Sequence, residues 1–588
     1  MATIVHLNGD TLTREEVINV SMNNFIVEID TSKNAASRHY IAKKVNEKKI
    51  VYGVTTGFGS NTDKMINQED TLDLQVNLLR SHACGMGNPL PKEVVRAVMV
   101  IRLNTLLKGY SGVQESTAAQ LAFLINNHIH PIIPEKGSVG ASGDLCPLSH
   151  MALPLIGEGE IEYQGSTYNT EEFLDTEAAK EIGFKPITLS YKEGLALNNG
   201  TTVMAALATI ALYRAENLIK VSTLATSLFY ESLCARADAF RFRKVHEVRR
   251  HQGQLDIADW MTRLLDGSKL IDLKQKDVIA KVLKKNKLPE NIDTVLRELN
   301  SIEEYDKQVQ VPKSVIHQLN AAGLKNLAEV MRFARLKWKP QDSYSIRCVP
   351  QVFGASKAAI DHAISIIDNE LNAACDNPLI FPDDDKVVSG GNFHGQPIAL
   401  VMDYLKLAIS EIGNITERQI NKLMDDNTND SLPSFLVLGT GLNSGLMITQ
   451  YAAASIASEN KVLVHPASAD SIPTCENTED HVSMGSISAR QAIQIIDNVE
   501  EILSIAILTG FYAIKMRLHQ FKEAGLESSF EKLLAPATYE FYEAIKDTNP
   551  NFAREDVIKV DRFLAPELKS IKENLSSYLV IANKYVGN

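Results

Sequence analysis

Cysteine, aromatic residues and long hydrophobic runs are all scarce in this sequence. The six cysteines are scattered over 588 residues and form no C-x-x-C pair, which excludes a disulfide-rich secreted scaffold and predicts a reduced, cytoplasmic protein. The longest clean apolar run, residues 203–212, is shorter than a membrane span. The first residues lack the basic and apolar regions of a secretory signal, so we expect neither export nor a membrane anchor.

Positive charge is also in deficit. Sixty Lys and Arg residues face 72 Asp and Glu residues, which gives a net charge of −12 at pH 7. That sign disfavours a general binder of nucleic acid or of anionic membranes. Hydrophobic residues make up 45% of the chain, which excludes a disordered protein and allows a large buried core. We expect about two to four domains and a small-molecule partner.

Helical periodicity dominates the sequence after residue 200. Apolar residues recur every three or four positions over residues 360–371, 401–415 and 495–506. Residues 202–237 are apolar nearly all round, which predicts a helix inside a bundle rather than on its surface. Strand-like alternation is confined mainly to residues 159–165, where we expect a small hairpin. The predicted fold class is mainly α, with a long central helix bundle.

Composition divides the chain into three predicted parts. Residues 1–200 form an N-terminal domain that carries the glycine-rich segment described below, and residues 201–524 form the central helical bundle. Within the bundle, residues from about 268 to 340 are rich in Lys and Glu and predict a solvated helical insertion. Residues 525–588 have a similar character and predict a C-terminal helical tail.

The segment most suggestive of chemistry is glycine-rich and spans residues 134–150. It is neither a P-loop nor a G-x-S-x-G elbow, because Gly143 is followed by Asp144 and Ser142 is followed directly by Gly143. A tight turn before a helix starting near Pro147 is the simplest interpretation. The tripeptide Ala141-Ser142-Gly143 offers another, since an unhindered glycine nitrogen beside an alanine carbonyl favours backbone cyclisation. Loss of water from the ring and from Ser142 would leave an exocyclic methylidene, a carbon electrophile.

This segment resembles the signature of the aromatic amino acid ammonia-lyase family, in which Ala-Ser-Gly becomes the 4-methylidene-imidazol-5-one (MIO) group. Further segments resemble family motifs in the family's own order, from about residue 50 to residue 515. They lie at residues 51–59, 77–83, 193–201, 250–254, 341–347, 376–378, 391–394 and 417–420. The number of ordered matches makes the resemblance specific.

The resemblance implies the lyase fold, with the MIO loop in the N-terminal domain, and a homotetramer in which three chains contribute to each active site. It implies an MIO formed from Ala141-Ser142-Gly143, with no diffusible cofactor. No metal is expected, because His, Cys and carboxylate residues never group at ligand spacing. The family joins the motifs on either side of residues 268–340 more briefly, so that stretch is an addition.

The resemblance also assigns roles to individual residues. Tyr52 would take the β-proton of the substrate, Arg347 would hold its carboxylate, and Tyr344 and Asn199 would tune the MIO and the bound substrate. Gln341 and Phe393 would line the pocket. His82 and Glu479 would contact the aromatic ring of the substrate. Each residue taken alone has a commoner structural role: a core tyrosine, an arginine in an ion pair, a buried histidine or an asparagine helix cap.

Glu479 is the residue that indicates the substrate. Residues 474–484 resemble histidine-type members of the family, whereas tyrosine- and phenylalanine-type members usually carry Gln or Asn at the position of Glu479. An imidazole offers N–H donors that suit a carboxylate, while a phenyl ring would leave that carboxylate unpaired. We therefore predict non-oxidative elimination of ammonia from L-histidine to give trans-urocanate. Glu479 could instead be a structural carboxylate paired with an arginine.

Three alternatives to this activity stay open. A tyrosine or phenylalanine ammonia-lyase, or a 2,3-aminomutase, would share the same motifs, because elimination and migration share their first steps. Gln396 weakens the histidine prediction, since histidine-type members commonly carry glutamate there and tyrosine-type members vary. An inactive helical scaffold is the third alternative, which the intact Ala-Ser-Gly, Tyr52, Tyr344 and Arg347 disfavour.

Overall fold

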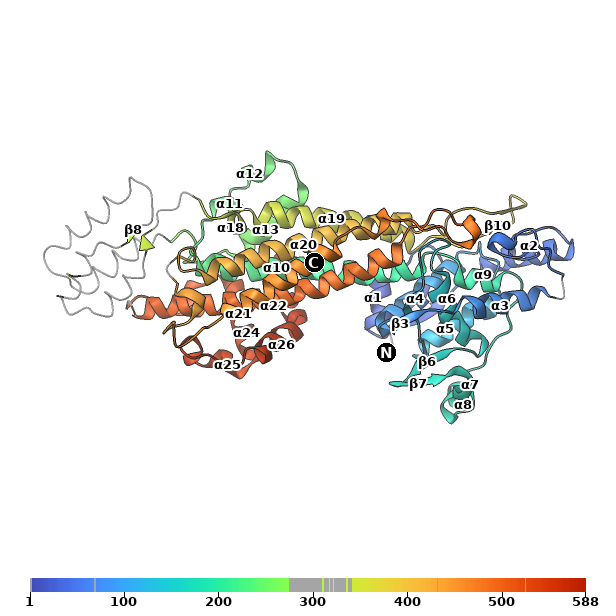
Figure 1. Cartoon of the computed structure of the whole chain (residues 1–588), viewed down its shortest axis with the longest axis horizontal. Coiled ribbons are helices and arrows are strands. Elements are labelled where there is room, and N and C mark those ends of the chain that lie inside the picture. The colour runs from blue at the N-terminus through green and yellow to red at the C-terminus, as the bar shows by residue number, and fades with distance from the viewer. Residues whose placement is uncertain are drawn as a thin grey trace. The chain divides into compact units, whose positions relative to one another are not determined.

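The computed structural model is mainly helical, as predicted (Figure 1). It describes residues 3–67, 70–273, 309–310, 317, 321, 335–336, 341–430, 432–523 and 525–587. Most of the predicted insertion at residues 268–340 therefore lies outside the described residues. No helix in the described ranges is long and apolar enough to cross a membrane.

The chain divides into two compact units, each assembled from three segments. Unit 1 comprises residues 1–214, 360–406 and 464–494, and unit 2 comprises residues 215–359, 407–463 and 495–588. Four long helices contribute residues to both units: α10 (Thr202–Ser232), α19 (Val349–Glu370), α20 (Gln396–Met424) and α22 (Gly485–Glu523). The three consecutive parts expected from composition stay a prediction.

Unit 1 combines short helices with several very short strands. Its helices are α1 (Arg14–Met22), α2 (Asn34–Asn46), α3 (Thr71–His82), α4 (Lys92–Leu107), α5 (Glu115–Asn126), α6 (Leu145–Ala152), α7 (Thr170–Leu174), α8 (Glu177–Ile182) and α9 (Glu193–Asn198). Its strands are β1 (Ile4–Leu7), β2 (Ile26–Ile29), β3 (Met86–Pro89), β4 (His130–Pro131), β5 (Pro134–Lys136), β6 (Glu160–Tyr163), β7 (Ser166–Asn169), β10 (Leu379–Phe381) and β11 (Lys386–Val388).

The predicted hairpin is confirmed and is part of a three-stranded sheet. β6 pairs antiparallel with β7, and β6 also pairs with β4. Gln164 and Gly165 connect the two strands with φ values of 51° and 84°, the left-handed conformation that suits a tight hairpin turn. The parallel pair β1–β2 and the antiparallel pairs β3–β5 and β10–β11 were not predicted, because strands of three or four residues are too short to show alternation.

Unit 2 is built largely of helices. Besides parts of the four long helices it contains α11 (Asp238–Arg241), α12 (Lys244–Glu247), α13 (Gln252–Leu264), α18 (Tyr344–Arg347), α21 (Met447–Leu463), α23 (Phe530–Leu533), α24 (Pro536–Thr548), α25 (Pro550–Ala553), α26 (Ala565–Glu573) and α27 (Leu575–Val586). Its short strands β8 (Val309–Gln310) and β9 (Arg335–Leu336) pair antiparallel.

The bundle of unit 2 is held by close packing between long helices. Gly510 of α22 lies so near α10 that an added Cβ would come within 2.7 Å of the Cβ of Leu228. The hydroxyl of Ser356 in α19 donates to the Ala408 carbonyl of α20 at 2.7 Å. Residues 221–233 of α10 and the turn after it are buried without interruption, which confirms that this apolar stretch lies inside the bundle.

A buried polar network in unit 1 joins α4 to the small sheet. The His130 imidazole, whose side chain is 3% exposed, lies 2.6 Å from a carboxylate oxygen of Glu162. The guanidinium of Arg96 lies beside it, 3.4 Å from Nε2. Burial lowers the pKa of His130 to about 4, and the charges of Lys92 and Arg96 act in the same direction. His130 is therefore neutral in the folded protein at neutral pH.

This histidine predicts a loss of stability in mild acid. The unfolded chain binds a proton at an ordinary histidine pKa near 6.5, whereas folded His130 does not until about pH 4. Stability should therefore fall as the pH is lowered from about 6.5 to about 4, by about 3 kcal/mol from this group, and not further below that range. Melting temperatures measured across this range for the parent and for His130→Gln test the idea, and equal slopes for the two proteins would contradict it.

Candidate active site

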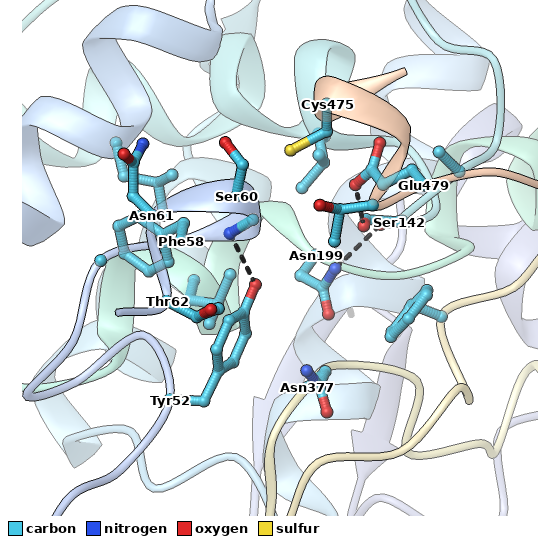
Figure 2. A pocket seen from close by; sticks show the side chains of 18 of the residues that line it. Tyr52, Phe58, Ser60, Asn61, Thr62, Ser142, Asn199, Asn377, Cys475 and Glu479 are labelled. Carbon is cyan, nitrogen blue, oxygen red and sulfur yellow. Dashed lines mark hydrogen bonds between the residues drawn. The ribbon is translucent and has the colours of Figure 1, made fainter. Parts of the chain in front are cut away.

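A cavity of about 910 Å³ lies in unit 1, and its lining comes from six stretches of the chain (Figure 2). Two precede the glycine-rich segment: a loop over residues 52–66 and helix α3 with residues 74–82. The next two are residues 141–145, which hold Ala141 and Ser142 of the tripeptide, and residues 195–199. The last two are loops at residues 377–394 and 475–481. The cavity thus gathers segments more than 400 residues apart in sequence.

The tripeptide crosses the cavity wall in a constrained conformation. Gly143 has a φ of 69°, and a Cβ at this position would come within 2.1 Å of the Gly200 carbonyl oxygen. No residue with a side chain fits there without movement of the backbone. The Ser142 carbonyl accepts hydrogen bonds from the Asn199 side-chain amide at 2.9 Å and from the Gly200 N–H at 3.3 Å. Asn199 thus contacts the tripeptide with its side chain, beyond any role at a helix end.

Asp144 anchors the tripeptide from the protein interior. Its carboxylate is fully buried and accepts hydrogen bonds from the hydroxyls of Ser138 and Ser486 at 3.1 and 2.7 Å and from the Met204 N–H at 2.8 Å. Burial raises the pKa of Asp144, and these hydrogen bonds oppose the rise because they stabilise the charged form. Its own N–H donates to the Gly200 carbonyl at 2.7 Å.

Glu479 faces the tripeptide from the opposite loop. One of its carboxylate oxygens, Oε1, accepts a hydrogen bond of 2.6 Å from the Ser142 hydroxyl, and the other, Oε2, accepts one of 2.8 Å from the Thr474 hydroxyl. Thr474 and Glu479 also exchange backbone hydrogen bonds, so the loop between them is a tight turn. Glu479 is therefore bound by two hydroxyls rather than by an arginine.

Tyr52 points into the same cavity from the loop that precedes α3. Its phenolic oxygen accepts a hydrogen bond from the Gly59 N–H at 3.1 Å, drawn as a dashed line in Figure 2. Burial raises the pKa of the Tyr52 phenol, while the Gly59 N–H acts in the opposite direction because it stabilises the phenolate. The bond fixes the phenol against the loop at residues 57–62.

His82 ends helix α3 at the cavity wall. The Ser81 hydroxyl lies 3.0 Å from its Nδ1. Burial lowers the pKa of the His82 imidazole, which favours the neutral ring, and the charge of Glu479 acts in the opposite direction. A neutral imidazole can either donate or accept a hydrogen bond, so His82 can adapt to a ligand.

The structure adds cavity residues that the sequence did not single out. Cys475 lies beside the loop of Tyr52, and the rings of His394 and His481 stack with centroids 5.5 Å apart. Asn377 also lines the cavity, and its side chain is hydrogen-bonded to Ser389 and to the Gly390 N–H. All four stand inside or next to the quoted family motifs, so their position beside predicted residues was the signal that could have found them.

The predicted site residues fall into two groups. Tyr52, His82, Ala141, Ser142, Asn199, Phe393 and Glu479 all line the cavity, and Gly143 completes the tripeptide. The other three predicted residues belong to unit 2 and are not part of this lining. They are Gln341, Tyr344 and Arg347.

Helix α18 presents the tyrosine and arginine of this second group together. Tyr344 is 70% exposed, and the guanidinium of Arg347 lies 4.5 Å from the centre of its ring. Arg347 also donates from Nε to the Asp342 carbonyl at 3.0 Å. The exposed phenol and the cation are thus available to a partner.

Across the described part of the chain, no three His, Cys, Asp or Glu side chains could hold a metal ion.

Comparison with known proteins gives consistent matches. The sequence model described as "aromatic amino acid lyase" matches residues 12–547. The histidine ammonia-lyase of Caldanaerobacter subterraneus subsp. tengcongensis is 43% identical over 516 residues, which are 87% of this chain and 88% of the relative. The histidine ammonia-lyase of Streptococcus pyogenes serotype M1 is 42% identical over 520 residues, 88% of each chain.

Solved structures with the same fold include enzymes of two kinds. Histidine ammonia-lyase from Trypanosoma cruzi has a TM-score of 0.78 and 33% identity, covering 99% of this chain and 96% of its own. Tyrosine aminomutase from Streptomyces globisporus has a TM-score of 0.81 and 33% identity, covering 99% and 98%. The fold is therefore common to both activities and does not by itself separate them.

Proposed function

The chain belongs to the aromatic amino acid lyase family, and on this premise we propose that it is a carbon–nitrogen lyase that converts L-histidine into trans-urocanate and ammonia. The observation that supports this substrate most directly is Glu479, whose carboxylate faces the Ala-Ser-Gly segment in a cavity also lined by His82. The similarity to histidine ammonia-lyases over 87% of the chain points the same way.

The tripeptide fits the requirements of an MIO precursor. Gly143 has no side chain to oppose a close approach of the backbone, and the Ser142 carbonyl is held by Asn199 and Gly200. The side-chain oxygen of Asn199 is buried and has no hydrogen-bond partner in the described part of the chain, so it remains available to a group formed here. Once formed from Ala141-Ser142-Gly143, the MIO supplies a carbon electrophile that turns the substrate amine into a leaving group.

We assign the proton transfer to Tyr52. A base must remove the β-proton of histidine as ammonia leaves, and a phenolate in the cavity can do so. The Gly59 N–H stabilises that phenolate, which offsets part of the burial that disfavours it. Phe393 gives the cavity an apolar wall for the substrate side chain.

Glu479 and His82 address the imidazole. A carboxylate accepts a charge-assisted hydrogen bond from a ring N–H, and a neutral histidine offers a second polar contact. A phenylalanine side chain would leave the carboxylate facing a hydrocarbon ring, which costs several kcal/mol when water is excluded. The cavity therefore favours histidine over phenylalanine in two ways: its carboxylate attracts the imidazole, and the same carboxylate would be left unpaired beside a phenyl ring.

We propose that the active site is completed in a homotetramer, with three chains contributing to each site. Tyr344 and Gln341 are exposed on unit 2, and Arg347 is half-buried beside Tyr344. Arg347 of a neighbouring chain would hold the substrate carboxylate through a bidentate contact, and Tyr344 would help position the reacting atoms. We place the enzyme in the cytoplasm, where its six free thiols would stay reduced.

The second candidate is a tyrosine 2,3-aminomutase or a tyrosine or phenylalanine ammonia-lyase. Its support is Gln396, where histidine-type members of the family commonly carry glutamate; its side-chain oxygen is buried and has no hydrogen-bond partner among the described residues. Glu479 opposes the phenylalanine enzymes, because a phenyl ring offers no hydrogen-bond donor to its carboxylate. The two candidates differ in substrate and product, so product analysis separates them.

Incubation of the purified protein with L-histidine, L-tyrosine and L-phenylalanine in separate reactions tests the proposal. We expect ammonia and urocanate from histidine, and turnover of the other two slower by at least about a hundredfold, since a mismatched polar contact costs about 3 kcal/mol or more. Products are identified by chromatography and mass. A β-amino acid from tyrosine or phenylalanine as the main product would favour the second candidate.

A further inference from the structure

In the described structure the carboxylate of Glu479 is already hydrogen-bonded to Ser142. Its Oε1 accepts the hydroxyl hydrogen of Ser142 at 2.6 Å, the shorter of its two side-chain hydrogen bonds (Figure 2). That hydroxyl is the group that must leave if Ala141-Ser142-Gly143 matures. Glu479, which we propose recognises the substrate imidazole, is thus hydrogen-bonded to Oγ of Ser142, the atom that maturation removes.

Further hydrogen bonds fix both Glu479 and Ser142 in place. The Thr474 hydroxyl donates to the other carboxylate oxygen of Glu479. The backbones of Thr474 and Glu479 also exchange two N–H to carbonyl hydrogen bonds, of 3.0 and 3.3 Å. Asn199 and Gly200 hold the Ser142 carbonyl. A contact fixed at both ends has the geometry that proton transfer requires, with donor and acceptor within hydrogen-bond reach.

We propose that Glu479 catalyses the dehydration of Ser142, an inference that rests on the proposed function. After ring closure, which releases one water, the Glu479 carboxylate takes the proton from Cα of Ser142. The resulting carboxyl group gives that proton to Oγ while the Cβ–Oγ bond breaks and the Cα–Cβ double bond forms. A second water leaves, and Glu479 returns to its carboxylate form, so atoms and charge balance without an added reagent.

Other acid–base groups around the cavity are less suited to this step. Asp144 is fully buried and bound by Ser138, Ser486 and Met204. The phenolic oxygen of Tyr52 is bound to the Gly59 N–H. Asp480 is exposed and lines the cavity without a hydrogen bond to Ser142 among the described contacts. Glu479 is the carboxylate in contact with the departing oxygen.

The step also explains how one carboxylate serves maturation and then recognition. While Ser142 keeps its hydroxyl, Oε1 of Glu479 is occupied. Dehydration removes this donor and frees Oε1, which then can accept the N–H of the substrate imidazole. Maturation therefore creates the electrophile and opens the imidazole site in the same event.

Peptide masses after a short pulse of synthesis test this proposal. In the parent, the peptide that contains residues 141–143 should have lost the mass of two waters. In Glu479→Gln it should still retain at least one of these two waters. Gln keeps the shape and a hydrogen-bonding oxygen but cannot shuttle the proton, so loss of the second water should slow by about 10²- to 10⁴-fold. Glu476→Gln makes the same change at an exposed carboxylate on the same turn, outside the cavity lining, so it is the matched control and should mature at the parental rate.

The outcomes separate this proposal from the proposed function. Maturation of Glu479→Gln at the parental rate would overturn the role of Glu479 and leave the lyase assignment intact. A parent chain that never loses two waters would overturn the MIO assignment itself. Thr474→Val keeps the carboxylate and removes only the bond that orients it, so its second water loss should lag by less. If Glu479→Gln fails to fold, a lag in Thr474→Val supports the proposal and the absence of a lag contradicts it.

Discussion

Replacement of Ser142 by alanine should abolish nearly all ammonia-lyase activity while leaving the fold intact. Alanine lacks the hydroxyl whose loss creates the methylidene carbon, so the variant cannot form the electrophile. We expect kcat/KM for histidine to fall by at least about 10³-fold, which is about 4 kcal/mol of transition-state stabilisation. Ser142 is half-buried and donates one side-chain hydrogen bond, to Glu479, so its removal should cost little stability.

The control for this variant is the chemistry of the parent. Borohydride or cyanide, which attack a carbon electrophile, should inactivate the parent and should not change the residual rate of Ser142→Ala. Helix content and oligomeric state are compared first, so that a loss of fold is not mistaken for a loss of chemistry. An active Ser142→Ala protein would remove the MIO assignment.

Helices and motif order could be predicted from the sequence because both depend on local pattern. The apolar repeats at residues 401–415 and 495–506 fall inside α20 and α22, and the repeat at 360–371 runs one residue past the end of α19. The apolar stretch after Thr202 proved to be α10. Seven of the predicted site residues line one cavity together, although they come from segments hundreds of residues apart. Here the family resemblance, rather than periodicity, supplied the long-range information.

What could not be predicted depends on contacts between distant segments. The turn at residues 475–477 has three consecutive residues with φ between 52° and 64° and contains no glycine, so nothing in its sequence signals that conformation. The hydrogen bond between Ser142 and Glu479 joins residues 337 positions apart. The stacking of His394 on His481 likewise arises only when two loops meet.

The placement of Gln341, Tyr344 and Arg347 shows a different limit. The resemblance assigns them to the active site, whereas the structure places them on unit 2, outside the lining of the cavity in unit 1. A sequence states which residues act together but not whether they act within one chain. The proposed tetramer reconciles the two, because a neighbouring chain can supply what this cavity lacks.

Replacement of Glu479 by glutamine should reduce turnover of histidine selectively. Gln keeps the size of the side chain and removes its charge, so packing around Thr474 and Ser142 should survive. A charge-assisted hydrogen bond contributes about 1.5–3 kcal/mol, which predicts a loss of at least about tenfold in kcat/KM for histidine. Per matured chain, turnover of phenylalanine, to the extent that it reacts, should be unaffected or improved, because the charge that its ring leaves unpaired is gone.

The most direct measurement is the ratio of kcat/KM for histidine to that for phenylalanine, in the parent and in Glu479→Gln. Rates are expressed per matured chain, with the matured fraction taken from peptide mass and tetramer content checked first. If Glu479 reads the imidazole, the ratio should fall by at least about tenfold in the variant. An unchanged ratio, with histidine turnover intact or with both substrates declining together, would show that Glu479 does not select histidine.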